Sequence, residues 1–244
     1  EFEKVKLFEK NPEFRKGKWN NILTLKNSPF LNKYNFSYIE NKLTLFIKDK
    51  KILIIDVNEI GQSDLLSKTI LRLESSLKKP LFLMKNEENP FFDTALSNKT
   101  VLPHSISLLN IKSIQDFQNK IGKKIESSRF RGNICIDGIE PWAENDWVGK
   151  VIKINDTSFK VEKKIPRCVA INLKPGSDDK SLNLLKFLKK TYNHFDMGIY
   201  LTVLENGKIN IGDKILDKWS SYQPQIEIFE LYILSHFWFN YLIK

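Results

Sequence analysis

The segment Lys-Lys-Ile-Pro-Arg-Cys-Val-Ala at residues 163–170 places an arginine directly before Cys168, one of only two cysteines in the chain. A thiolate is the nucleophilic and metal-binding form of cysteine, and a neighbouring guanidinium favours it. Cys168 is therefore either a reactive or metal-binding thiolate beside Arg167, or a small apolar residue at the start of a buried strand over 168–173. Cys135 has no charged neighbour in the sequence, which favours a core role.

Arginine is scarce, since only five of the 39 Lys and Arg residues are arginine. A guanidinium can form two parallel hydrogen bonds to a phosphate or carboxylate, which lysine cannot do. Strand-like alternation would place Arg129, Arg131 and Asn133 on one face of an extended segment, where they could grip an anionic ligand. The alternative is a pair of surface arginines bridged to the acidic segment 143–146.

His194 and Asp196 flank Phe195 in the segment Asn-His-Phe-Asp-Met-Gly. A histidine near a carboxylate can transfer protons, although a turn residue between two elements would look the same. The sequence contains no zinc-finger spacing, phosphate-binding loop or Gly-x-Ser-x-Gly motif.

Composition restricts the classes of partner and compartment. The net charge of +10 comes mainly from scattered lysine, which indicates a solvated surface rather than a specific nucleic-acid site. An acidic ligand or acidic protein partner suits this charge. Two cysteines favour a reducing compartment, and the first residues do not resemble a signal peptide, so we expect a cytoplasmic protein.

No stretch is long and apolar enough to predict a transmembrane segment. The aromatic segment 229–244 is predicted to be a helix that packs on the body, with peripheral membrane contact or an oligomer surface as alternatives.

Periodicity predicts many short strands and few helices, and therefore a mostly β, barrel-like α+β body. Helices are expected over 63–77, 113–124 and 181–192, with Ser63 and Ser113 as N-caps of the first two and an end near Gly122. Strands are expected over 19–27, 42–56, 80–85 and 132–138, in a hairpin around Asn155-Asp156, and in a second hairpin over 198–215.

The order of six motifs resembles the MOSC family, named for the C-terminal module of molybdenum-cofactor sulfurases, and most of all its bacterial stand-alone members. The motifs are LLNIKSIQDF, RFRGNICIDG, PWAENDW, KVIKIND, PRCVAINLKPG and HFDMGIYLTVLENGKINIGDKI, over about residues 101–215. The resemblance implies a MOSC-type β-barrel with a few peripheral helices at 96–217. Residues 1–95 would be part of a β-rich N-terminal domain, and 218–244 an aromatic helical tail.

The resemblance also implies a site. In cofactor-binding members, such as the mitochondrial amidoxime-reducing component, the cysteine of this motif is a molybdenum ligand, which corresponds to Cys168. The Arg-x-Asn pair, which lies against the pterin and its phosphate, corresponds to Arg131 and Asn133. The further candidate cofactor-binding residues are Arg129, Arg167, Asn110, Ser113, His194 and Asp196. Binding of pyridoxal phosphate is not expected.

We therefore expect a molybdenum-cofactor (molybdopterin) protein that reduces small N- or S-oxygenated substrates with electrons from an acidic donor of ferredoxin or flavodoxin type. Two alternatives remain: a sulfur carrier or cofactor-delivery module that uses a Cys168 persulfide, and a cofactor-free binding protein. The sequence departs from the family in two respects, and the second of them favours the last alternative. Met197 replaces a second cysteine of some members, and a Pro-Val-Lys segment that contacts the cofactor in relatives is not found in this sequence.

Overall fold

A computed structural model describes residues 5–8, 14–15, 18–19, 23–85, 105–177, 179–217 and 226–231. Contacts divide the chain into two units. The first comprises Glu1–Pro103, Pro175–Asp178 and Leu234–Lys244, and the second comprises His104–Lys174 and Asp179–Ile233.

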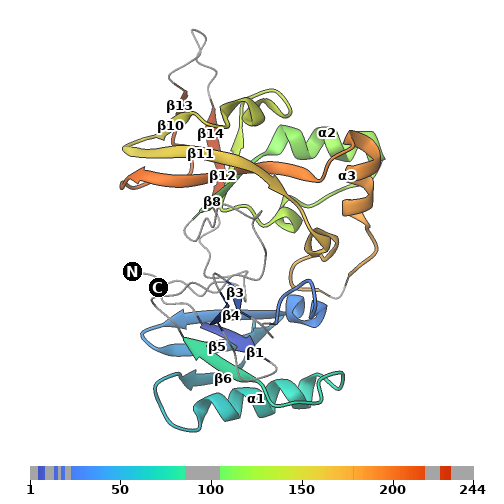
Figure 1. The fold of residues 1–244 in the computed structure, drawn as a ribbon, viewed down its shortest axis with the longest axis vertical. Helices are drawn as coiled ribbons and strands as arrows, with labels where there is room; N and C mark the ends of the chain where they lie inside the picture. Colours follow the sequence, from blue (N-terminus) through green and yellow to red (C-terminus); the bar gives the residue numbers. More distant parts are fainter. Residues whose placement is uncertain are drawn as a thin grey trace. The chain divides into compact units, whose positions relative to one another are not determined.

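The second unit is built on a seven-stranded sheet with the order β13-β10-β11-β12-β8-β9-β14 (Figure 1). Only β8 and β9 pair in parallel, and the other neighbours are antiparallel. The strands are β8 (Ile106–Asn110), β9 (Ile134–Asp137), β10 (Val151–Ile154), β11 (Thr157–Pro166), β12 (Asp196–Glu205), β13 (Ile215–Asp217) and β14 (Glu227–Leu231).

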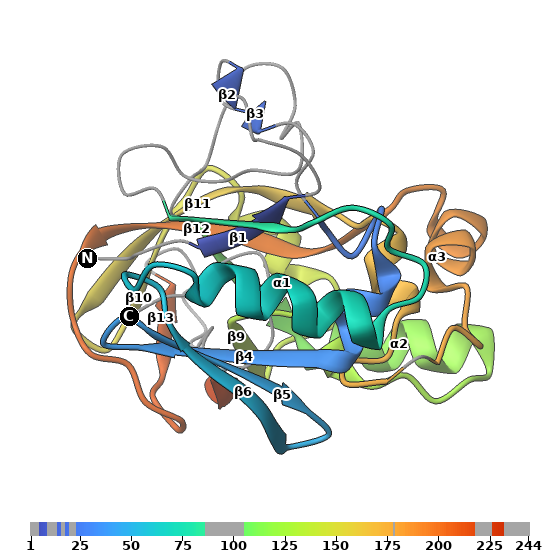
Figure 2. The ribbon, with the colours of Figure 1, turned by 90° about the horizontal axis from the view of Figure 1, so that it is seen from below.

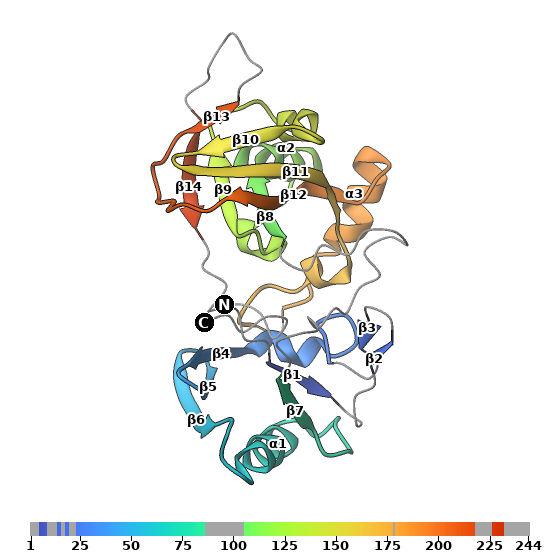
Figure 3. The ribbon, with the colours of Figure 1, turned by 60° about the vertical axis from the view of Figure 1, so that its left-hand side comes forward.

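The two outer strands of this sheet, β13 and β14, approach each other and nearly close it into a barrel (Figure 3). Lys214 forms an isolated bridge with Glu227, and the backbone N–H of Ile215 donates to the carbonyl of Ile226 at 3.0 Å. The predicted mostly β, barrel-like α+β fold is confirmed.

Alternation along the strands fills the barrel interior with branched apolar side chains. In β11, for example, Phe159 and Val161 are buried while Lys160 between them is exposed. The buried interior residues are Leu108, Ile134, Ile136, Trp147, Ile152, Ile154, Phe159, Val161, Ile199, Leu201, Ile215, Ile226 and Ile228. Burial of each such side chain stabilises the fold by about 1.5–3 kcal/mol relative to exposure.

In the described part of the second unit, two helices and three short 3-10 turns accompany the sheet. The helices α2 (Ile111–Ile121) and α3 (Leu184–Tyr192) contact each other over a second core that includes Phe117, Phe130 and Leu188. The 3-10 turns are η2 (Ser127–Phe130), η3 (Ala143–Trp147) and η4 (Val169–Asn172).

The start of α2 differs from the prediction. Asn110 is the N-cap, because its side-chain oxygen accepts from the N–H of Lys112 at 2.9 Å, whereas Ser113 lies fully buried inside the first turn. The predicted end is confirmed, since Gly122 adopts the left-handed conformation that terminates helices.

Four expected elements are wrong. Residues 25–27 of the strand expected over 19–27 form a turn. Residues 169–172 form the turn η4 rather than a strand. The hairpin over 198–215 does not form, because β11 and β8 occupy both edges of β12 and β13 must pair with β10 instead. Residues 227–231 of the expected helical tail form the strand β14, which buries Ile228 in the barrel, while 232–244 lie outside the described residues.

The first unit contains an antiparallel sheet of β4 (Tyr34–Ile39), β5 (Lys42–Ile47) and β6 (Lys50–Asp56), as predicted for 42–56. The helix α1 (Gln62–Leu73) contacts β6 and β7 (Phe82–Lys85), and it begins after Gly61 rather than at the predicted cap Ser63 (Figure 2). The other elements among the described residues of this unit are η1 (Pro29–Lys33), β1 (Val5–Phe8), β2 (Phe14–Arg15) and β3 (Lys18–Trp19). In the part of the chain that the structure describes, none of the helices combines the length and apolar character needed to cross a bilayer.

Candidate functional site

Cys168 lies where the chain leaves the barrel. β11 ends at Pro166, and Cys168 caps the N-terminus of η4 with extended backbone. Its side chain is half-buried and forms no disulfide, and the next residue, Val169, is 43% exposed. The thiol therefore stands at the edge of the core, where a ligand from solvent can reach it. Cys135 is fully buried in β9 and has no such access.

Arg167 is held by backbone carbonyls. Its Nε donates to the carbonyl of Met197 at 2.8 Å, its Nη2 donates to the same oxygen, and its Nη1 donates to the carbonyl of Phe130 at 2.8 Å. Burial lowers the pKa of Arg167 to about 10, while Tyr200 and Cys168, when ionised, act in the opposite direction. Arg167 thus stays cationic at neutral pH, with its charge close to the thiol of Cys168.

Arg131 supplies a second buried cation near Cys168. It adopts a left-handed conformation (φ 51°), and its Nη1 donates to the carbonyls of Ala170 at 2.7 Å and Arg129 at 3.0 Å. Burial lowers the pKa of Arg131 to about 10, and the charge of ionised Cys168 opposes this shift. Two guanidiniums, each fixed by carbonyl groups, therefore place positive charge close to Cys168.

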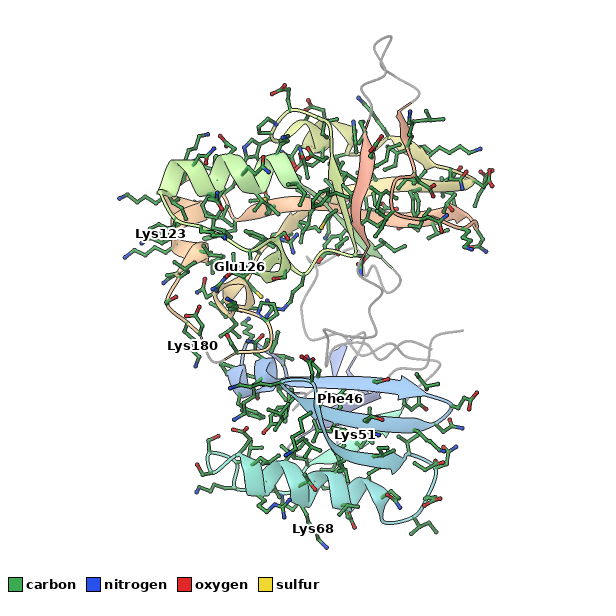
Figure 4. The ribbon with its side chains drawn as sticks, turned by 180° about the vertical axis from the view of Figure 1, so that it is seen from behind. Phe46, Lys51, Lys68, Lys123, Glu126 and Lys180 are labelled. Carbon is green, nitrogen blue, oxygen red and sulfur yellow. The ribbon has the colours of Figure 1, made fainter. Side chains whose placement is uncertain are left out.

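Arg129 has a different environment from the one predicted. It is 1% exposed and bonds to Glu126 at 2.7 Å, Asp179 at 2.9 Å and the carbonyl of Asn172 at 2.9 Å. Hydrogen bonding from Arg129 lowers the pKa of Glu126, labelled in Figure 4, to about 2. Arg129 thus ties the end of η4 to the segment before η2.

Two expectations for this segment are wrong. Residues 127–130 are a 3-10 turn, so Arg129 and Arg131 do not share the face of an extended strand. They are also not surface residues bridged to 143–146, because both are buried and bond to other groups. Asn133 joins β8 to β9 instead, as its Oδ1 accepts from the N–H and hydroxyl of Ser107, both at 2.8 Å.

Asn110 and Ser113 converge on a buried carboxylate, Glu144. The amide of Asn110 donates to Glu144 Oε2 at 2.9 Å, and the hydroxyl of Ser113 donates to Oε1 at 2.8 Å. Glu144 is completely buried, which raises its pKa against the opposing effect of these hydrogen bonds. The network joins the start of α2 to η3, and no hydrogen bond between described residues connects it to Cys168.

Glu144→Gln provides a test of this burial. A raised folded pKa makes ionisation destabilise the fold, so the variant should gain stability relative to wild type as pH rises above the usual glutamate range. The gain is bounded by about 1.4 kcal/mol per pH unit. Urea unfolding between about pH 4 and 8 measures it, with the exposed Glu140→Gln as control. A pH-independent difference would contradict the raised pKa.

His194 and Asp196 lie at the start of β12. The ring of His194 stacks on Tyr192 with centroids 5.7 Å apart, and its Nδ1 accepts from the N–H of Asp196 at 3.1 Å. The carboxylate of Asp196 contributes to the electrostatic environment of Arg167, where it raises the pKa of the guanidinium against the larger effect of burial. The structure thus brings Arg131, Arg167 and Asp196 near Cys168.

Gly198 makes room for this arrangement. It adopts φ +77°, and a Cβ there would lie 2.4 Å from the carbonyl of Leu108, 2.7 Å from Leu109 Cδ2 and 3.3 Å from Nη2 of Arg167. We expect Gly198→Ala to lower the free energy of unfolding by about 2–3 kcal/mol, because strain and overpacking combine.

The control for Gly198→Ala is Gly149→Ala, since Gly149 has φ +84° with nothing within 4 Å of its added Cβ. The control isolates backbone strain from the steric clash. Equal losses in urea unfolding would show that the contact with β8 and Arg167 contributes nothing.

Glu126, Asp179 and Gly198 contribute to the surroundings of Cys168 but were not predicted from the sequence, and neither was Glu144, whose network is separate from Cys168. The spacing of Glu126 three residues before Arg129 was a usable signal for an ion pair in a turn. The other three depend on contacts between distant segments, for which the sequence carries no local signal.

Comparison with known proteins agrees with this architecture. A profile of the MOSC domain matches residues 99–216. The chain is 29% identical over 122 residues to mitochondrial amidoxime reducing component 2 of Rattus norvegicus, which covers 45% of this chain and 36% of that protein. It is 28% identical over 120 residues to mitochondrial amidoxime-reducing component 1 of Homo sapiens, covering 44% and 35%. The chain thus spans about a third of these curated relatives.

Proposed function

We propose that this chain, whose residues 99–216 match the MOSC domain, binds a molybdenum–pterin cofactor at Cys168, because that domain family is associated with the molybdenum cofactor. We propose further that it reduces small N- or S-oxygenated molecules with electrons from a partner protein. The observation that carries the proposal is that Cys168, a partly buried cysteine, lies close to the guanidiniums of both Arg131 and Arg167.

The donor set at this position suits such a cofactor. Among the described residues, no group of three or more His, Cys, Asp or Glu side chains could hold a metal ion by itself. A metal that brings its other ligands on a pterin dithiolene needs only one soft protein ligand, and a thiolate is appropriate. Cys168 would supply that ligand, and the charges of Arg131 and Arg167 suit an anionic cofactor.

The remaining predicted residues would support the site indirectly, apart from His194. Arg129 would act indirectly, by fixing the carbonyl of Asn172 at the end of the turn that follows Cys168. Asn133 would hold β8 against the segment that carries Arg131. Asn110 and Ser113 would act only through the Glu144 network, and His194 is a candidate proton donor near the site.

The reaction class follows from the cofactor. Molybdenum on a pterin supplies two-electron exchange when it is bound. Reduction of an amidoxime to an amidine consumes two electrons and two protons and releases the oxygen as water. The chain itself would provide the thiolate and the cationic surroundings. The two free cysteines, Cys135 and Cys168, suit a reducing compartment such as the cytoplasm.

Elemental analysis after expression in a host that makes the cofactor tests the proposal. We expect molybdenum to copurify with the protein, and a small-molecule reductant to drive conversion of an aromatic amidoxime to the amidine. A chain that carries no molybdenum would refute the proposal. Molybdenum without turnover, or a persulfide on Cys168 by mass spectrometry, would favour cofactor delivery or sulfur transfer instead.

A further inference from the structure

The turn that carries Cys168 is held by two arginines through its carbonyl groups. Nη1 of Arg131 donates to the carbonyl of Ala170 at 2.7 Å. Nη1 of Arg129 donates to the carbonyl of Asn172, the last residue of η4, at 2.9 Å. The backbone of η4 is thus fixed both near its middle and at its end, and Cys168 caps the turn that these bonds hold.

Arg129 also holds the loop that follows η4. Its Nη2 donates to the carboxylate of Asp179 at 2.9 Å, and the N–H of Lys174 donates to the carbonyl of Asp179 at 3.2 Å. The two bonds close the base of a loop that runs from Lys174 to Asp179. Because the same guanidinium binds Asn172 and Asp179, a shift of the loop base would be passed to the end of η4.

A single asparagine holds the tip of this loop. The first unit includes Pro175–Ser177 together with Asn32, which lies in η1 and is 6% exposed. The side-chain amide of Asn32 donates to the carbonyl of Ser177 at 2.6 Å, and its own carbonyl accepts from the N–H of Gly176 at 3.0 Å. Asn32 therefore binds the backbone of the tip twice, as donor and as acceptor.

The chain between η4 and the tip is short and stiff. Leu173, Lys174 and Pro175 alone separate η4 from Gly176. Proline fixes its own φ, and the following Gly176 adopts φ 72°, a combination typical of tight turns. Leu173 is buried, and its carbonyl accepts from Nη2 of Arg131 at 3.4 Å. Movement of the tip is therefore poorly absorbed before it reaches η4.

We infer that Asn32 is a positioning residue for the cofactor site, because its hold on the loop tip keeps η4 and Cys168 in place. The inference rests on the proposed function, in which Cys168 is the ligand of the cofactor. A segment that is already ordered binds more tightly, since less conformational freedom is lost on binding. Without the Asn32 amide, the carbonyl of Ser177 loses this donor, and the loop and η4 should sample more conformations.

The test measures how fast iodoacetamide alkylates each cysteine of the cofactor-free full chain. Asn32→Asp keeps the size of the side chain but replaces the amide donor with an oxygen. Peptide mass spectrometry follows both thiols. We expect alkylation of Cys168 to become about three- to tenfold faster, which is the effect of one net hydrogen bond on an equilibrium. Cys135, buried in β9, should stay unmodified because the barrel remains folded.

Ser67→Ala is the matched control. Ser67 is buried in the same unit, and its hydroxyl accepts from the N–H of Leu81 at 2.8 Å, so the variant removes a buried hydrogen bond that does not involve the loop. This control should alkylate at about the wild-type rate.

A second variant, Gly176→Ala, perturbs the same contact from the loop side. It strains the tip through its positive φ, with nothing within 4 Å of the added Cβ. Gly149→Ala is its control, because Gly149 also has a positive φ and open space around its added Cβ. Gly176→Ala should speed alkylation of Cys168, and Gly149→Ala should not.

Unchanged alkylation of Cys168 in both loop variants would overturn the inference, as would faster alkylation of both cysteines, which reports unfolding of the barrel. In protein loaded with the cofactor, molybdenum should be lost after dilution faster from Asn32→Asp than from Ser67→Ala. Molybdenum that leaves both variants at the wild-type rate would leave the proposed function standing and overturn the inference. Faster alkylation of Cys168 in a chain that never holds molybdenum would support the positioning role and refute the proposed function.

Discussion

Cys168→Ser is expected to lower the molybdenum content of the purified protein by about tenfold or more and to remove reductase activity. A serine hydroxyl is a hard ligand that stays protonated at neutral pH, so it replaces the thiolate neither in charge nor in softness. The half-buried position at the N-cap of η4 accepts serine readily, so the fold should persist. Elemental analysis and circular dichroism on the same preparation measure both quantities.

Cys135→Ser is the control, because it removes the other free thiol from a completely buried position in β9. It should cost stability, since a hydroxyl enters the core, yet leave the molybdenum content of the folded protein near that of wild type. Equal metal content in the wild type and the Cys168 variant would show that the thiol is not a ligand. Equal losses in both cysteine variants would point to general destabilisation.

Arg129→Leu is expected to lower the free energy of unfolding by about 3 kcal/mol. The guanidinium is 1% exposed and bonds to Glu126, to Asp179 and to the carbonyl of Asn172, so its loss leaves three acceptors without their shared donor. Each carboxylate is 36% exposed and regains water, which keeps the loss below that of a fully buried pair. Urea unfolding of cofactor-free protein measures the change.

Arg72→Leu makes the same substitution on an exposed face of α1 and should change stability by less than about 0.5 kcal/mol. Arg129→Lys keeps the charge without the planar fork and should lie between the two. If Arg129 served mainly to grip a cofactor, Arg129→Leu would spare the stability of cofactor-free protein and reduce molybdenum retention alone.

Local sequence signals were sufficient to predict the secondary structure where a single residue determines the backbone conformation. Gly122 ends α2 because glycine accepts a left-handed conformation, and Asn155 turns β10 into β11 with φ 49° for a related reason. The alternation of apolar residues in 42–56 likewise predicted the two strands found there. Motif order, rather than periodicity, indicated the MOSC domain that the profile match confirms.

Hydrogen-bond partners and strand pairings that depend on the tertiary fold could not be predicted from the sequence. Arg129 bonds to groups 43 and 50 residues away, and nothing near it identifies Asn172 or Asp179 as the acceptors. Ser113 was predicted to be a helix N-cap, but its hydroxyl donates to Glu144, because η3 lies next to the start of α2. The pairing of β13 with β10 could not be predicted either, because it depends on which strand edges of the sheet are still unpaired in the folded domain.

The strand β14 has a practical consequence for anyone who isolates this domain. The family match ends at residue 216, whereas β14 covers Glu227–Leu231 and contributes Ile228 to the barrel interior. A fragment trimmed to the matched borders would leave β9 as a bare strand edge, with the apolar side chains around Ile134 and Ile136 uncovered. Such edges recruit strands from other molecules. The fragment should self-associate, and its insolubility would reflect an opened barrel rather than any property of the intact protein.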